Sequence, residues 1–230
     1  MIYADIHTHT AFSPDSRADM ADMLERAVAL GLKIYGVSEH FNYDYDRLHL
    51  QIDGREVPPI DEAAYFSRAR QLQAACAGKL LFLVGAEFGF DHSPRALERY
   101  MRTAEEYRPD FIVNSIHTCL GMDCYFPHYC AGRSKEYAYN AYLYRVLESL
   151  DAPYPYDVVA HIGYCSRNAT YPDILARYFA LGGRKVSFAS DAHDTSRIGE
   201  KRELVSEALK SIGFTHLTIP CRGEHLRAEL

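Results

Sequence analysis

The sequence contains no tryptophan, no long hydrophobic run and no excess of basic residues. No apolar segment approaches the roughly 18 residues that a membrane-spanning helix needs. The formal net charge of -6 argues against non-specific binding to nucleic acids or to membrane surfaces. The first five residues lack the basic start of a signal peptide. We therefore expect a cytoplasmic protein that binds neither membranes nor nucleic acids.

A C-x-x-C pair is also missing, although the chain has six cysteines. Without a sign of export, we expect these cysteines to be reduced thiols. Cys119, Cys124 and Cys130 lie close together in the sequence, but their spacing matches no common zinc motif. A metal knuckle formed by these three residues is therefore the weaker interpretation.

The chain has no internal repeat, low-complexity stretch or linker, so we predict a single domain over residues 1–230. Chains of this length bury about 70 to 75% of their unfolded surface. Such a chain can build its core without disulfides or structural metal ions. Any bound metal is then available for chemistry.

Short apolar runs alternate with amphipathic helical patterns from end to end. The predicted strands cover residues 3–10, 33–40, 80–90, 111–118, 157–163, 185–190 and 214–220. The predicted helices cover residues 18–30, 61–77, 94–107, 134–150, 172–181 and 200–212. This alternation predicts an α/β fold, with a parallel sheet or barrel inside a layer of helices.

Potential metal ligands lie at the ends of nearly all these strands. Such strand ends converge on one rim of an α/β barrel, where active sites are built. The H-x-H pattern also places His7 and His9 on the same side of a strand, because side chains repeat every two residues. The candidate ligands are His7, His9, Asp15, His40, Glu87, His117, His161, Asp191 and His193.

Each candidate has a simpler interpretation when taken alone. Asp15 could cap a helix, and His40 or His117 could be a polar loop residue. Glu87 is harder to explain in this way, because it interrupts an apolar run and a buried carboxylate needs a partner. The coincidence over six strands favours a common site. Imidazoles and carboxylates suit Zn, Mn or Fe, and nine ligands exceed the needs of one ion, so we predict two or three ions.

The chain resembles the PHP family of metal-dependent phosphoesterases, which includes one type of histidinol phosphatase and a domain of bacterial replicative polymerases. The resemblance is to the histidinol phosphatase branch and runs collinearly over most of the chain. It rests on the motifs DIHTHTAFSPDS, VSEH, GAEFGFD, NSIH, YFPHYCAGRSKEYAY, DVVAHIGYCSR and SDAHDTSRIG. It implies a distorted (β/α)7-like barrel with a trinuclear metal site at one rim.

The resemblance also implies a role for each candidate ligand. One metal would be held by His7, His9, Glu87 and Asp191. Glu87 would bridge to a second metal held by His117 and His161. Asp15, His40 and His193 would hold the third. Arg167 matches an arginine that contacts the substrate phosphate in this branch, and we take Arg167, Asp191 and His193 as the catalytic candidates.

One departure from the family pattern concerns the barrel itself. A helix and a strand are missing between Arg167 and Tyr171, where only three residues remain. Either the barrel is open or closes with fewer strands, or the sequence omits a segment of the natural protein. The missing βα unit supplies none of the predicted ligands. An open barrel edge and 18 tyrosines would favour self-association, and the oligomeric state stays open.

The expected activity is hydrolysis of a small phosphate monoester, with histidinol phosphate as the leading substrate. A metal would turn water into hydroxide for attack on phosphorus, while Arg167 would clamp the phosphate oxygens. In the loop over residues 41–59, Asp44 and Asp46 could bind a cationic substrate. The alternatives are a phosphoesterase for nucleotides, a metal-binding scaffold without catalysis, and an amidohydrolase, which would usually need a bridging lysine that is missing here.

Overall fold

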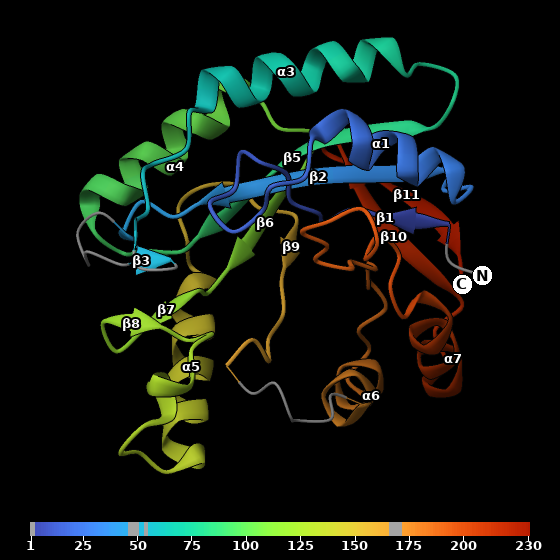
Figure 1. The fold of residues 1–230 in the computed structure, drawn as a ribbon. Helices are drawn as coiled ribbons and strands as arrows, with labels where there is room; N and C mark the ends of the chain where they lie inside the picture. Colours follow the sequence, from blue (N-terminus) through green and yellow to red (C-terminus); the bar gives the residue numbers. More distant parts are fainter. Residues whose placement is uncertain (1–2, 46–50, 53–54, 166–171) are drawn as a thin grey trace.

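The computed structural model describes residues 3–45, 51–52, 55–165 and 172–230. Its centre is a curled parallel sheet of five strands that forms half of a barrel (Figure 1). Along the sheet the strands are β1 (Ala4–Asp5), β2 (Ile34–Phe41), β5 (Leu81–Gly89), β6 (Ile112–Ser115) and β9 (Val158–Val159). This arrangement confirms the predicted fold class, a distorted α/β barrel.

Six helices surround this sheet in the described part of the chain. They are α1 (Met20–Ala29), α3 (Glu62–Ala75), α4 (Pro94–Tyr107), α5 (Lys135–Ser149), α6 (Pro172–Ala180) and α7 (Arg202–Ile212). In Figure 1, α3 and α4 lie above the sheet and α5, α6 and α7 lie below it. Side chains such as Asp19 and Ser134 accept hydrogen bonds from backbone N–H groups of the first turn. These caps explain why the predicted helix boundaries agree with the observed ones to within a few residues.

The strands β2 and β5 form the longest pairing of the sheet, with eight residue pairs from Ile34–Leu81 to Phe41–Phe88. Their side chains are buried almost throughout, as expected for a parallel sheet covered on both faces. Gly36 lets the segment just before His7 lie close against β2, because a Cβ at Gly36 would lie only 2.9 Å from the Ile6 carbonyl oxygen. The two strands carry His40 and Glu87 at their carboxyl ends.

The predicted strand at 3–10 is too long, and the predicted strand at 185–190 is wrong. Regular pairing at the first is confined to β1, and the second does not form a strand. The two segments nevertheless run side by side, since Asp191 N donates to His7 O at 3.0 Å and His9 N donates to Ala192 O at 2.8 Å. Asp191 has a left-handed backbone, with φ of 53°. This backbone conformation interrupts regular strand pairing at Asp191, which is itself a candidate ligand.

The strict alternation of strands and helices is also wrong at the C-terminus. β10 (His216–Cys221) pairs antiparallel with β11 (Glu224–Glu229). The turn residues Arg222 and Gly223 both have positive φ, 52° and 80°, as tight hairpins require. Arg222 is held there by Asp110, which accepts hydrogen bonds from its backbone N at 2.6 Å and from its Nε at 2.8 Å.

Two long connections contain short elements, one in the predicted loop over residues 41–59 and one after β6. The first includes the two-residue strands β3 (Gln51–Ile52) and β4 (Arg55–Glu56). The second includes the hairpin of β7 (Thr118–Cys119) and β8 (Met122–Asp123), followed by the 3-10 helix η1 (Pro127–Cys130). Within the described residues, no helix is long and apolar enough to cross a bilayer.

The predicted gap in the barrel falls between β9 and α6. The stretch from Arg167 to Tyr171 lies within residues 166–171, outside the described residues. β9 pairs with β6 and is the last strand of the five-stranded sheet on that side. The half-barrel is therefore open at β9 in the described part of the chain, in line with the predicted loss of a βα unit.

Candidate metal centre

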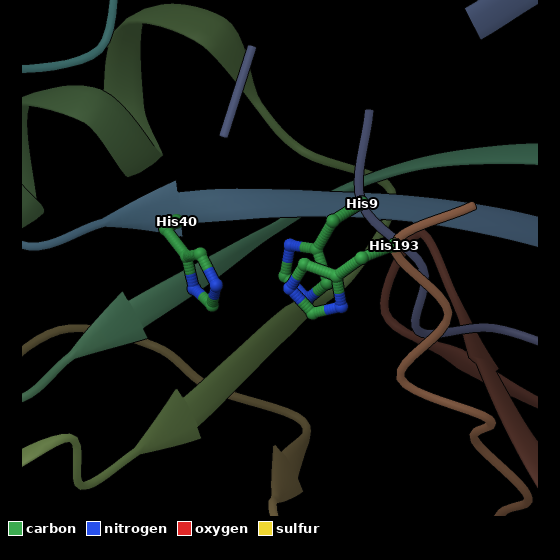
Figure 2. A group of neighbouring side chains, drawn as sticks. All are labelled: His9, His40 and His193. Carbon is green, nitrogen blue, oxygen red and sulfur yellow. The ribbon is translucent and has the colours of Figure 1, made fainter. Parts of the chain in front are cut away.

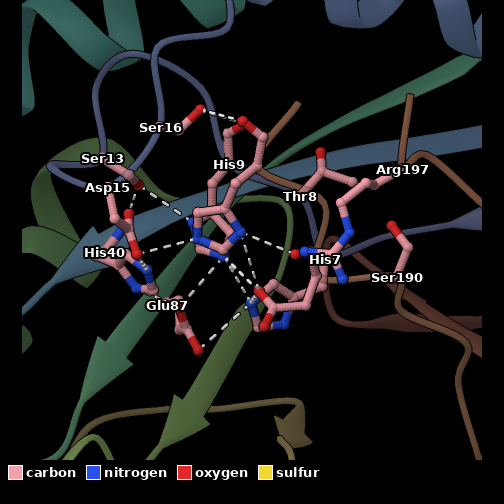
Figure 3. A network of polar contacts seen from close by, with 12 residues as sticks. His7, Thr8, His9, Ser13, Asp15, Ser16, His40, Glu87, Ser190 and Arg197 are labelled. Atoms are coloured by element: carbon pink, nitrogen blue, oxygen red, sulfur yellow. Dashed lines mark hydrogen bonds and ion pairs between the residues drawn. The ribbon is translucent and has the colours of Figure 1, made fainter. Parts of the chain in front are cut away.

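Glu87, near the carboxyl end of β5, is the hub of the candidate site. It is fully buried, and five imidazole nitrogens surround its carboxylate; Figure 3 shows three of these residues, His7, His9 and His40, beside it. The distances to the nearer oxygen are 2.6 Å from His40, 3.0 Å from His161, 3.1 Å from His117, 3.4 Å from His7 and 3.6 Å from His9. A carboxylate offers about four lone-pair positions, so five imidazoles exceed what direct hydrogen bonds to it can use.

His7 and His9 follow β1 and point to the same side, as the H-x-H spacing predicted. Their Nε2 atoms lie 3.0 Å apart. Asp191 Oδ1 lies 3.1 Å from His9 Nε2 and 3.6 Å from His7 Nε2. The carboxylate reaches this position because its chain segment runs beside the first one. These three ligand atoms lie within 4.8 Å of one another.

A second convergence involves Asp15, His40 and His193. Asp15 Oδ2 lies 3.4 Å from His40 Nε2 and 3.2 Å from His193 Nε2. The His9 ring stacks against the rings of both histidines, with centroid distances of 4.1 Å to His40 and 4.3 Å to His193 (Figure 2). The three imidazoles come from three chain segments that only the fold brings together.

The donor atoms of this cluster fit metal ions better than they fit one another. Four buried atoms form no hydrogen bond of acceptable geometry: His40 Nδ1, Glu87 Oε2, His161 Nδ1 and His193 Nε2. The first two lie only 2.6 Å apart without being aligned for a hydrogen bond. The described residues include four overlapping groups that could hold a metal ion: His7–His9–Asp191, His7–Glu87–His161, His40–Glu87–His117 and His9–His40–His193. Overlapping groups of imidazoles and carboxylates are the donor set of adjacent transition-metal ions.

The electrostatics of the cluster favour ionised carboxylates. Burial opposes a charge on Glu87, but His7, His117 and His40 overcome it and hold its pKa well below the ordinary value. Burial, followed by repulsion from His40, lowers the pKa of His9 to about 3. His9 is therefore neutral at physiological pH, which is the form of imidazole that binds metal.

Glu39 and Ser13 support the ligands, and sequence analysis missed both. Glu39 is fully buried and accepts hydrogen bonds from Thr10 N and from Ser13 Oγ. Ser13 Oγ in turn accepts from His40 N and lies 3.1 Å from His9 Nδ1. This network holds the chain after His9 against the end of β2. The only sequence signal was a carboxylate directly before His40 in a buried strand.

Three further polar residues, also missed, hold the cluster from other sides. Ser115 Oγ donates to Glu87 Oε1 at 2.6 Å, and Asn42 Oδ1 lies 2.8 Å from His117 Nδ1. Asp5 is fully buried, where it accepts from Ser190 N at 3.0 Å and from Gly199 N at 2.8 Å. Asp5 thus ties the segment that carries Asp191 to β1. In metal sites, a hydrogen bond to the imidazole nitrogen that does not bind the metal fixes the orientation of the ring. The contact of Asn42 with His117 Nδ1 is of this kind.

A cavity of about 1060 Å³ opens over the cluster. The candidate ligands that line it are Asp15, His40, His117, His161, Asp191 and His193. Arg197 and Lys201 also line it, and the sequence had not singled them out. Arg167 lies outside the described residues. Asp46 also lies outside the described residues. Asp44 is buried, and its carboxylate accepts a hydrogen bond from Thr118 Oγ1. Asp44 therefore does not face the cavity as the predicted cation-binding residue.

Comparison with known families gives the same assignment as the motifs. The profile of the PHP domain matches residues 5–188. The chain belongs to the PHP domain family. The predicted resemblance is therefore confirmed over most of the chain, including seven of the nine candidate ligands, while Asp191 and His193 lie just beyond the matched range.

Relatives of this PHP domain are named histidinol-phosphatases. It is 25% identical over 227 residues to a probable histidinol-phosphatase of Thermotoga maritima, with 94% of both chains covered. It is 23% identical over 210 residues to a histidinol-phosphatase of Lactococcus lactis, covering 90% of this chain and 66% of the relative.

A solved structure shares the fold. The histidinol phosphate phosphatase of Lactococcus lactis, crystallised with Zn, L-histidinol and phosphate, superposes with a TM-score of 0.83. The match covers 97% of this chain and 98% of the other, at 20% sequence identity. At this identity the likeness establishes the architecture of the half-barrel and its surrounding helices.

Proposed function

We propose that this PHP domain is a histidinol-phosphate phosphatase, which hydrolyses L-histidinol phosphate to L-histidinol and phosphate. The observation that carries the proposal is the convergence of five imidazoles on the buried carboxylate of Glu87, with Asp15 and Asp191 beside them. The names of the relatives favour this substrate over nucleotides. A scaffold without catalysis would have no need to keep this arrangement beneath an open cavity.

Two or three divalent ions of Zn, Mn or Fe are the proposed cofactors. Their ligands would be His7, His9, Asp15, His40, Glu87, His117, His161, Asp191 and His193. When bound, such ions supply an acidified water with a pKa of about 7 and offset the charge of the phosphate oxygens. Three dications would outweigh the three carboxylates of the cluster, which suits an anionic substrate in a protein of net charge -6.

The chain's own residues bind and orient the phosphate in this proposal. Asp191 and His193 line the cavity, and His193 Nδ1 lies 2.8 Å from Asp191 O, which orients Nε2 toward Asp15. Arg197 and Lys201 add positive charge to the cavity wall. We assign Arg167 as a bidentate phosphate clamp. Its replacement by alanine should raise KM and lower kcat by more than a few-fold, and a smaller change would remove Arg167 from the mechanism.

The first experiment measures phosphate release from L-histidinol phosphate, a nucleoside monophosphate and phenyl phosphate by Mn- or Zn-loaded protein. The variant His7→Ala removes a candidate ligand, and His225→Ala removes an exposed histidine on β11 as the matched control. We expect the wild type to prefer L-histidinol phosphate strongly. His7→Ala should lose this activity, whereas His225→Ala should keep it.

Two outcomes of this experiment would contradict the proposal. Activity on the nucleotide or aryl ester alone would make the protein a general phosphoesterase. Retained metal without activity on any ester would favour the scaffold.

We also propose a single domain, because no linker or repeat interrupts the sequence. The proposed location is cytoplasmic, because all six cysteines are free thiols, as expected in a reducing compartment. Non-reducing peptide mapping of native protein would contradict the location by finding a disulfide.

A further inference from the structure

Asp123, at the end of β8, presents a carboxylate to the cavity from the side of the β7–β8 hairpin. The residue is 6% exposed and lines the cavity. Tyr45 donates its hydroxyl to Oδ2 at 2.7 Å, and the backbone N of Tyr125 donates to Oδ1 at 2.8 Å. Both oxygens are therefore oriented by groups that lie in the same wall.

Neither donor to Asp123 carries a charge. Among the described residues, no arginine, lysine or histidine forms an ion pair with this carboxylate. Asp110, which is similarly buried, differs in having Arg70 Nη1 and Arg222 Nε both at 2.8 Å. A buried carboxylate without a cation is costly, and this one faces a cavity that a ligand can enter. Its surroundings suit a positively charged group of the ligand.

Aromatic rings connect the metal ligands to Asp123. The Tyr164 ring lies 4.9 Å from the ring of His161 and 5.3 Å from that of His117. The Tyr125 ring follows at 6.0 Å from Tyr164. Both tyrosines line the cavity, together with Phe126 and Tyr45. Aromatic faces attract cations and pack against flat rings. This wall therefore suits a ligand that carries both a positive charge and a flat ring.

We propose that Asp123 is a specificity-determining residue that binds the cationic group of the leaving alcohol, while Tyr125 and Tyr164 pack against its ring or carbon skeleton. The inference rests on the proposed function, in which the phosphate lies at the histidine cluster. The alcohol then extends along the tyrosine wall to the carboxylate. Esters with neutral or anionic alcohols gain nothing from Asp123, which accounts for selection among phosphate monoesters that the cluster alone would treat alike.

The test compares metal-loaded wild-type protein with Asp123→Asn, which keeps an oxygen acceptor and removes the charge. Binding of L-histidinol is measured by calorimetry, and kcat/KM is measured for L-histidinol phosphate and phenyl phosphate. We expect the Kd of L-histidinol to rise, and kcat/KM for its phosphate to fall through KM, by at least about tenfold, a typical loss for a charged hydrogen bond. Phenyl phosphate turnover should change little. Asp151→Asn removes an equal charge from an exposed turn as control.

Failure of the inference and failure of the proposed function give different results. If Asp123→Asn weakens L-histidinol binding but the wild type does not hydrolyse its phosphate, the binding role stands and the proposed reaction falls. An equal loss on both esters would make Asp123 a structural residue. No loss on either, or no binding of L-histidinol to the wild type, would overturn the inference.

A wild-type measurement covers the case in which Asp123→Asn does not fold. At about pH 8, where an unperturbed imidazole is neutral, L-histidinol is compared with 3-(imidazol-4-yl)propan-1-ol, which lacks the ammonium group. We expect the ammonium-free alcohol to bind at least about tenfold more weakly. Equal affinities would show that Asp123 does not select for the ammonium group of L-histidinol.

Discussion

Glu87 and Asp44 are both buried carboxylates, yet their surroundings shift their pKa values in opposite directions. Glu87 meets imidazoles on all sides, and they lower its pKa despite burial. Asp44 accepts a hydrogen bond from Thr118 but lies near Asp91, and burial, reinforced by that charge, raises its pKa to about 6. At the scale of single residues, the neighbours decide whether a carboxylate can hold a cation or costs stability.

Replacing Asp44 by asparagine should stabilise the protein increasingly as the pH rises. The folded-state pKa is about 6, above the unfolded value of about 3.9, so wild-type stability falls as pH rises through this window. The asparagine variant has no such penalty. Its advantage in free energy of unfolding should grow by about 2 kcal/mol from about pH 4.5 to pH 7.5, measured by urea unfolding of metal-free protein.

The same titration on Asp151→Asn supplies the control for this prediction. Asp151 is exposed, so its replacement should leave the pH dependence of stability unchanged. A difference between wild type and Asp44→Asn that stays constant over this pH range would show that Asp44 is not buried as a high-pKa carboxyl group.

At the scale of elements, the close contact of β1 with β2 positions the first pair of histidines. A Cβ at Gly36 would lie 2.9 Å from Ile6 O and 3.1 Å from Ile6 Cα. These are backbone atoms, which cannot rotate away as a side chain would. Gly36→Ala should therefore push the segment of His7 and His9 away from β2.

We expect Gly36→Ala to lower the free energy of unfolding by roughly 1 to 3 kcal/mol and to reduce the metal bound per chain. Urea unfolding and elemental analysis after dialysis would measure both effects. Ser67→Ala, on the exposed face of α3, is the matched control. Unchanged metal content together with unchanged stability would mean that β1 does not depend on this glycine.

Helices and strands differed in how well the sequence predicted them, and the reason is local. The helices carry their own signals, such as the capping side chains Asp19, Asp61 and Ser134. The strands near the site are short, and pairing with a distant segment defines them. The hairpin of β10 and β11 was missed because its turn contains Arg222 at positive φ, which Asp110 stabilises from elsewhere in the fold.

At the scale of the whole molecule, the candidate ligands connect segments from residue 7 to residue 193. Metal removal should therefore lower the stability of the entire fold. If free metal is at about 100 times Kd, binding adds about 2.7 kcal/mol, and for a chain of this size its loss should lower Tm by roughly 5 to 10 °C.

Differential scanning calorimetry before and after chelation would measure this change in Tm. Adding Zn or Mn back should restore the original value, whereas Mg, which prefers oxygen ligands, should not. A Tm that is unaffected by chelation would show that the nine residues do not hold metal in the folded protein.

The sequence by itself determined the α/β class, the family and the set of candidate ligands. Alternating strand and helix patterns and histidines at strand ends are local features that can be recognised in the sequence alone. Only the tertiary structure decided that Glu87 stands at the centre, that Glu39 and Asp5 support the cluster, and that Asp123 rather than Asp44 faces the cavity. A sequence pattern specifies which side chains are present on an element. Their charge state, partners and exposure depend on distant segments that meet only when the chain folds.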